Sequence, residues 1–120
     1  MNLNFKIEQD YKEALKWFRK AAEQDYSRAQ YALGSMYFQG KGVGKDYAEA
    51  LKWFRKAADQ DYGKAQYAIG RMYEKGEGVG QNYAKALNWY RKAADQDNEC
   101  SQYALGIILK MKRHKHPSCG

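Results

Sequence analysis

The residues best suited to chemistry lie at the end of the chain. His114 and His116 are the only histidines, and Cys119 follows the second by three positions. A His-x-His pair with one cysteine offers three ligands to a soft metal, whereas a structural zinc site is closed by four. Because a fourth ligand is missing, we predict neither a metal site nor a cofactor.

The remainder of the chain offers little for catalysis. Its only cysteine is Cys100, it has no histidine, and it has no Ser/Lys pair at a recognisable spacing. Nucleophilic catalysis requires a nucleophile with a base beside it. We therefore predict that the protein is not an enzyme.

Positive charge is concentrated in the same terminal segment. The 120 residues carry a net charge of +7, and the part after Gly106 contributes four basic residues and no acid: Lys110, Lys112, Arg113 and Lys115. A basic arm suits nucleic acid, although the rest of the chain shows no basic stripe or known motif for it. Chain termini are commonly disordered, so we expect a disordered basic tail over 113–120. Nucleic-acid binding through this tail remains an alternative function.

Composition predicts a cytoplasmic protein. No apolar run approaches the roughly 20 residues of a membrane span. The opening MNLNFKIEQD lacks the basic flank and apolar stretch of a secretory signal. Two cysteines cannot form a disulfide framework, which favours a reducing compartment.

A repeat of 36 residues organises most of the chain. Residues 11–46 and 47–82 are identical at 25 of 36 positions, and a third copy begins at Tyr83 and fades after Gly106. Repetition of this length is typical of stacked supersecondary units. We therefore expect an array of units rather than one irregular core.

Each unit has the periodicity of two helices. Apolar residues recur at i, i+3, i+4 and i+7, as in Tyr47, Ala50, Leu51 and Phe54, and no stretch alternates with period two. The predicted helices are 11–24, 27–39, 47–60, 63–75, 83–96 and 99–112. Short connections make sequential helices antiparallel, so the predicted fold class is all-α.

Recurrent polar residues and glycines mark the ends of these helices. Asp10 and Asp46 each precede a glutamate by three positions, the spacing of a capping box, and Asn82 replaces the aspartate in the third copy. Glycines 40, 42 and 44, repeated at 76, 78 and 80, predict a loop with positive φ. Asp25, Asp61 and Asp97 are expected in the left-handed conformation that ends a helix.

Two further residue types recur inside the helices. Gly34, Gly70 and Gly106 interrupt the first helix of each unit, which predicts close approach by the backbone of a neighbouring helix. Trp17, Trp53 and Trp89 lie on the second helices and are expected to wedge between successive units.

These motifs resemble the Sel-1-like repeat (SLR), a relative of the tetratricopeptide repeat. The residues that carry the resemblance in the first complete unit are Ala29, Leu33, Gly34, Tyr37, Gly40, Gly42, Val43, Asp46, Ala50, Trp53, Lys56, Ala57 and Ala58. The resemblance divides the chain into a half repeat over 10–26, repeats over 27–62 and 63–98, and a half repeat over 99–112. The family usually has glycine where this chain has Asp25, Asp61 and Asp97.

The resemblance implies a right-handed superhelix that acts as a scaffold or adaptor. Its first helices would line a concave face that holds another protein or a peptide. A cysteine-rich branch of the family, linked to penicillin binding, has disulfides within its repeats. The two complete units here contain no cysteine, so a hydrolase related to that branch is the least favoured alternative.

The expected partner-binding positions lie on the first helices, opposite their apolar stripe. They are Arg28, Tyr31, Ser35, Phe38, Lys64, Tyr67, Arg71, Glu74 and Tyr103. Several differ between copies, as a recognition surface requires, and the three tyrosines are constant and would serve as aromatic anchors. The alternative is that these tyrosines complete the helix packing. The apolar last helix, with Ile107, Ile108 and Leu109, leaves three alternatives: self-association, capture by a partner, or a chain cut from a longer array.

Overall fold

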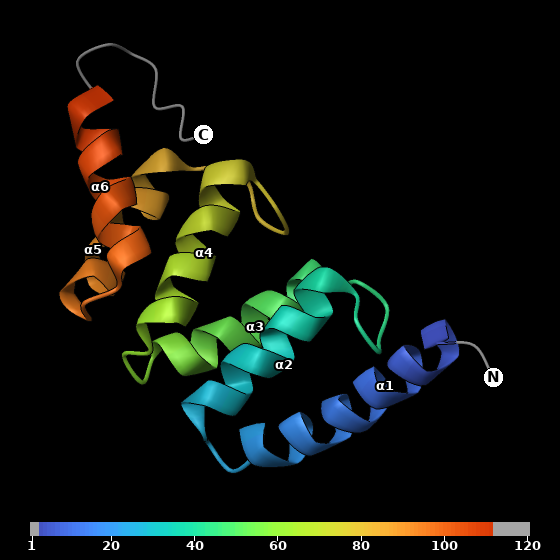
Figure 1. The fold of residues 1–120 in the computed structure, drawn as a ribbon. Helices are drawn as coiled ribbons and strands as arrows, with labels where there is room; N and C mark the ends of the chain where they lie inside the picture. Colours follow the sequence, from blue (N-terminus) through green and yellow to red (C-terminus); the bar gives the residue numbers. More distant parts are fainter. Residues whose placement is uncertain (1–2, 112–120) are drawn as a thin grey trace. The chain divides into compact units, whose positions relative to one another are not determined.

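The computed structural model describes residues 3–111, which form six helices and no strand (Figure 1). The helices are α1 (Leu3–Ala22), α2 (Ser27–Gln39), α3 (Tyr47–Ala58), α4 (Gly63–Lys75), α5 (Tyr83–Asp95) and α6 (Glu99–Met111). The predicted all-α fold class is confirmed. The basic tail predicted over 113–120 lies outside the described residues.

The chain divides into two compact units. The first, Met1–Gln60, contains α1, α2 and α3, and the second, Asp61–Gly120, contains α4, α5 and α6. Each 36-residue repeat consists of a first helix and a second helix, and α2–α3 and α4–α5 are the two equivalent pairs. The first unit adds a second-type helix before its pair, and the second unit adds a first-type helix after its pair.

The loop within each pair has the same hydrogen bonds in both units. Gly40 and Gly76 adopt φ values of 70° and 72°, and their N–H groups donate to the carbonyls of Met36 and Met72 at 2.8 Å. The predicted positive φ is also found at 42 and 78, but not at 44 or 80. The repeated glycines therefore build the same chain reversal twice.

Side-chain caps start the second helix of each pair. Asp46 accepts a hydrogen bond from the Glu49 N–H, and Asn82 accepts one from the Lys85 N–H, both at 3.0 Å. The cap predicted at Asp10 is wrong, because α1 begins at Leu3 and Asp10 lies inside the helix. No proline or glycine occurs between residues 3 and 22, so the helix extends past the expected boundary.

The turn between consecutive pairs depends on the three aspartates. Asp25, Asp61 and Asp97 have φ values of 67°, 61° and 60°, as expected from the sequence. Aspartate tolerates this left-handed conformation better than most non-glycine residues because its short side chain can hydrogen-bond locally. Its use in place of the family's glycine therefore leaves the turn intact.

The glycines inside α2 and α4 make room for an aromatic ring. A Cβ added at Gly34 would lie 2.8 Å from the ring of Phe54, and one at Gly70 would lie 2.6 Å from the ring of Tyr90. The nearest neighbour is thus a side chain at both glycines, and the predicted backbone contact occurs only at Gly34, where the Ala50 carbonyl oxygen would lie 3.1 Å from the added Cβ. A Cβ at Gly106 would meet nothing within 4 Å, because no described helix covers that side of α6.

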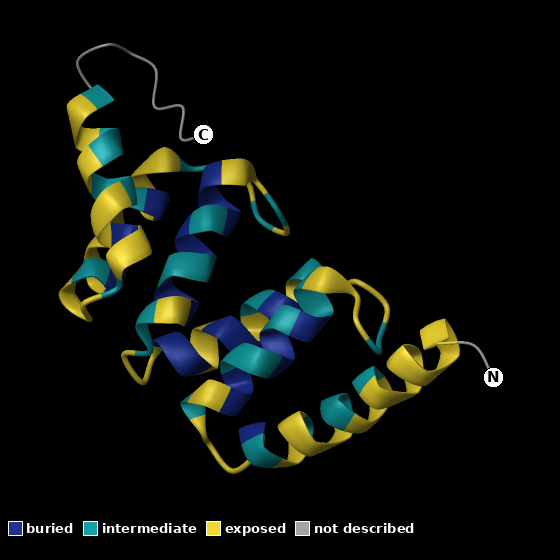
Figure 2. Ribbon diagram, viewed as in Figure 1, coloured by how far each residue is buried: buried dark blue, intermediate teal, exposed yellow. Residues whose placement is uncertain are grey.

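The three tryptophans have different environments. Trp53 is 5% exposed and packs in a cluster with Ala22, Ala29 and Leu33. Trp89 is half-buried, and Trp17 is 54% exposed with its indole N–H donating to Glu13 at 3.2 Å. The packing role predicted for Trp17 is therefore wrong. Figure 2 shows most of α1 as exposed, and Ala22 is the buried residue of this helix.

Candidate functional site

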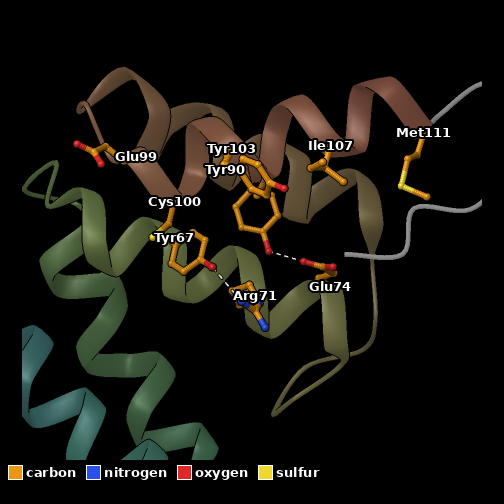
Figure 3. Close-up of a pocket in the computed structure, with 10 residues that line it drawn as sticks. Tyr67, Arg71, Glu74, Tyr90, Glu99, Cys100, Tyr103, Ile107 and Met111 are labelled. Atoms are coloured by element: carbon orange, nitrogen blue, oxygen red, sulfur yellow. Dashed lines mark hydrogen bonds between the residues drawn. The ribbon is translucent and has the colours of Figure 1, made fainter. Parts of the chain in front are cut away.

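Four of the nine predicted partner-binding residues line one cleft in the second unit. Tyr67, Arg71 and Glu74 come from α4 and Tyr103 comes from α6, and the cleft has a volume of about 700 Å³ (Figure 3). This volume lies within the range of about 300–1,000 Å³ that is usual for ligand sites. The cleft is the principal candidate site.

The other five predicted residues do not line this cleft. Lys64 is exposed on α4. In the first unit, Arg28 lines a smaller pocket of about 520 Å³ with Phe18, Ala21 and Tyr26, among others. Tyr31, Ser35 and Phe38 line neither of these two pockets.

Helix α6 supplies most of the apolar wall of the cleft. Ala104, Ile107 and Met111 lie on one face of this helix, and the ring of Tyr90 reaches the cleft from α5. Figure 3 shows Glu99 at one end of the cleft and Met111 at the other, with Arg71 between them. The cleft therefore joins an apolar wall to a central cationic group, and its lining also includes the acidic residues Glu74 and Glu99.

Arg71 is held in place by Tyr67. Its Nη1 donates to the Tyr67 hydroxyl at 2.9 Å, and the guanidinium carbon lies 5.8 Å from the centre of the Tyr67 ring. This hydrogen bond raises the pKa of Arg71, although partial burial opposes the shift. Its Nε is buried without a hydrogen-bond acceptor among the described residues, so one donor of the guanidinium is left unsatisfied.

Glu74 is a buried carboxylate with a dedicated partner. It is 8% exposed, and the Tyr90 hydroxyl donates a short hydrogen bond to its Oε1. Burial of the phenol, followed by the hydrogen bond to Glu74 and the charge of that carboxylate, raises the pKa of Tyr90 well above its ordinary value of 10.0. The phenol therefore remains a hydrogen-bond donor at physiological pH.

The three repeated tyrosines do not share one role. Tyr31 packs on Phe54 and Tyr67 packs on Tyr90, each with ring centroids 5.6 Å apart. Tyr103 is 74% exposed. The first two therefore contribute to packing within a helix pair, while Tyr103 offers most of its ring to solvent at the edge of the cleft.

Sequence reasoning missed Tyr90, Glu99, Cys100, Ala104, Ile107 and Met111, all of which line the cleft. For Tyr90 a signal was present. The equivalent positions are Phe18 and Phe54, so Tyr90 departs from its copies together with Glu74, which replaces Phe38. The change to Tyr90 supplies a hydrogen-bond donor and the change to Glu74 supplies an acceptor, so the two changes indicate a matched pair.

The described residues show no constellation for metal chemistry. Within residues 3–111, no group of three or more His, Cys, Asp or Glu side chains is placed to hold a metal ion. The three possible ligands considered from the sequence, His114, His116 and Cys119, lie outside the described residues. In the same described part of the chain, none of the helices is both long and apolar enough to cross a membrane.

Paired helices with repeated glycine loops define an all-helical repeat protein. The family model of the Sel1 repeat matches residues 4–26, 27–62 and 63–98, and the chain belongs to the Sel1 repeat family. Sel1 repeats generally serve as protein–protein interaction modules. A comparison with curated protein sequences gave no match.

Two solved structures are similar to this chain. One is a Sel1 repeat protein from Oxalobacter formigenes, with 42% identity and a TM-score of 0.75 over 82% of this chain and 41% of that chain. The other is a protective antigen present in uropathogenic Escherichia coli strains that displays an SLR fold, with 44% identity and a TM-score of 0.76 over 78% of this chain and 20% of that one. The chain thus spans less than half the length of either protein.

Proposed function

We propose that this chain binds a short segment of a partner protein in the cleft lined by α4, α5 and α6. The observation that carries the proposal is the convergence of Tyr67, Arg71, Glu74 and Tyr103 on one cleft. Two of these positions, 71 and 74, differ from the equivalent positions 35 and 38 in the first unit. A recognition surface on a repeat scaffold requires that the packing residues repeat from unit to unit while the binding residues differ.

The lining favours a partner segment with an apolar or aromatic side chain beside a carboxylate. Ile107, Met111 and the exposed ring of Tyr103 provide apolar contact area. Arg71 lines the cleft, and a guanidinium matches the two oxygens of a carboxylate. Arginine and tyrosine are also the residue types that dominate interface energetics.

Peptide selection on the full chain tests this proposal. A phage-displayed library of random peptides, panned on the immobilised protein, should enrich sequences with Asp or Glu close to an aromatic or branched aliphatic residue. A selected peptide, made synthetically, should then bind about tenfold or more weakly to Arg71→Gln and to Tyr103→Ala, since each removes a contact worth about 1.4 kcal/mol or more.

A matched variant separates recognition from general charge effects. Arg91→Gln removes the same charge from an exposed position on α5 and should leave the peptide's affinity unchanged. Thermal unfolding of each variant verifies that it is folded. The proposal is contradicted if panning enriches no such motif, or if the selected peptide binds Arg71→Gln and Tyr103→Ala as tightly as the unmodified chain.

A further inference from the structure

The charges that line the cleft differ in balance from those of the whole chain. The lining contains one basic side chain, Arg71, and two acidic ones, Glu74 and Glu99, whereas the whole chain carries a net charge of +7. A segment whose only charge is a carboxylate would therefore enter a cleft in which acids outnumber bases. Because like charges placed together across an interface are costly, such a segment matches Arg71 but not the rest of the lining.

The two glutamates differ in how far they are already engaged. Glu74 is 8% exposed and accepts the hydrogen bond from the Tyr90 hydroxyl. Glu99 is exposed in the first turn of α6, and it forms no ion pair with the residues between 3 and 111. Glu99 is therefore the acidic side chain of the cleft that a ligand can reach.

The segment that leads into α6 is more acidic than its two equivalents. Segments 23–28 and 59–64 each contain two acidic residues and end in a basic one. In the third copy, 95–100, the basic residue is replaced by Cys100 and Glu99 adds a third acid. Both changed residues line the cleft, and both changes make this end of it more negative.

The acidic end, the guanidinium and the apolar wall follow one another along the cleft. Figure 3 shows Glu99 and Cys100 towards one end, Arg71 between the ends, and Ile107 and Met111 towards the other. From Glu99 to Met111 the helix rises by about 18 Å at about 1.5 Å per residue. An extended peptide covers this length with about five or six residues at about 3.3 Å each. One short segment can therefore meet the three features with different side chains.

We propose that the partner segment carries three side chains in this order: a lysine or arginine that pairs with Glu99, an aspartate or glutamate at Arg71, and an apolar side chain against Ile107 and Met111. This inference rests on the proposed function and adds to it a basic residue and a fixed orientation. A segment bound in the reverse sense places its basic residue against the apolar wall, where the charge has no partner and is costly to desolvate. Glu99 is thus the residue that sets the orientation of the segment.

A double-mutant cycle between the chain and a peptide tests the pairing with Glu99. Peptides enriched by panning on the full chain should carry Lys or Arg within a few residues of the acid, on the side away from the apolar residue. One such synthetic peptide should bind Glu99→Gln about fivefold or more weakly than the unmodified chain. Changing its basic residue to Gln should weaken binding to the unmodified chain by a similar factor and have little further effect on Glu99→Gln.

Charge reversal makes the same test more stringent. Glu99→Lys should bind the selected peptide at least about tenfold more weakly, and a peptide with Glu in place of its basic residue should recover most of that loss. Glu23→Lys makes the same change of charge at an exposed position in the equivalent segment 23–28 and should leave the affinity unchanged. Fluorescence anisotropy measures the affinities, and circular dichroism verifies that each variant is folded.

Cys100 provides a direct readout of orientation. It is an exposed free cysteine that lines the cleft next to Glu99, and Cys119→Ser leaves it as the only thiol of the chain. In a redox buffer, a peptide with a cysteine beside its basic residue should form more disulfide with Cys100 than the same peptide with a cysteine beside its apolar residue. Adding Cys100→Ser and Met111→Cys moves the thiol to the other end and should reverse this preference, as measured by mass spectrometry.

The outcomes separate this inference from the proposed function. If panning enriches no acidic and apolar motif, the proposed function fails and this inference fails with it. If the motif is enriched and Arg71→Gln weakens binding, three results would overturn the inference alone. They are selected peptides without a basic residue, a Glu99→Gln variant that binds the peptide as tightly as the unmodified chain, and equal disulfide formation from both ends of the peptide.

Discussion

The pairs α2–α3 and α4–α5 share one framework but differ in what surrounds one aromatic ring of the second helix. In both, a tyrosine of the first helix packs on a ring of the second at 5.6 Å. In the first pair that ring belongs to Phe54 and is also 6.4 Å from the ring of Phe38. In the second pair the ring is Tyr90, and its hydroxyl donates to Glu74 in place of the aromatic contact.

This difference shows how a buried polar residue can be placed in the repeat while the two helices still pack. A carboxylate beside a phenylalanine ring would be buried without a donor, which is costly. The exchange of Phe38 for Glu74 is accommodated because Phe54 is exchanged for Tyr90 at the same contact. As a result the second unit gains a polar edge on its cleft while its helices pack as in the first.

Removing the shared ring should have the largest effect. Phe54→Ala empties the space over Gly34 and should lower the free energy of unfolding by about 3–5 kcal/mol. Phe18→Ala, at the equivalent but exposed position, should cost about 1 kcal/mol or less. Urea denaturation at low micromolar concentration checks both values, and equal losses would show that the α1 ring is also part of a core.

Separating the polar pair should have an intermediate effect. Tyr90→Phe leaves the buried Glu74 carboxylate without its donor and should cost about 1–3 kcal/mol. The double variant Glu74→Phe/Tyr90→Phe recreates the contact of the first unit and should recover most of this loss. A double-mutant cycle by urea denaturation measures the coupling, and additive losses would refute the matched exchange.

Raising the pH should weaken the contribution of the Tyr90–Glu74 contact to stability, with the smallest effect of the three. The pKa of Tyr90 is raised in the folded state above its unfolded value of 10.0, so only the unfolded chain loses this proton as pH rises past about 10. The stabilisation is complete below that pH and then falls by about 1.4 kcal/mol per pH unit. The stability advantage of the unmodified chain over Tyr90→Phe should narrow accordingly, and a constant difference between pH 9 and 11 would contradict the raised pKa.

Local structure was predictable where a residue type has one dominant conformational use. The loop glycines at 40 and 76, the caps Asp46 and Asn82, and the left-handed Asp25 behave as their types dictate. Their repetition every 36 residues excludes coincidence. The helix boundaries follow from these signals to within a residue or two, except at the start of α1.

The failures come from contacts that the repeat pattern does not contain. Asp10 has the cap spacing, but the preceding residues continue the helix. Trp17 has the core spacing, but no described helix covers it. Gly106 matches its copies in sequence and lacks their ring. In each case the prediction was made from the position of the residue within the 36-residue repeat. Burial depends instead on which helices lie beside that residue.

The cleft was only partly predictable for a related reason. Variation between copies identifies Arg71 and Glu74, which differ from Ser35 and Phe38. It does not single out Ile107 or Met111. Their equivalents are Arg71 and Lys75, but every residue from 107 to 111 differs from its equivalent in α4, so a difference at either position is no distinguishing signal.

The second unit, and not the equivalent face of the first, is proposed to hold the partner. Amide hydrogen exchange of the full chain with and without the selected peptide tests this directly. Exchange should slow in residues 67–74 and 99–107 and stay unchanged in the equivalent residues 31–38. Protection of 31–38 to the same degree, or protection confined to other segments, would contradict it.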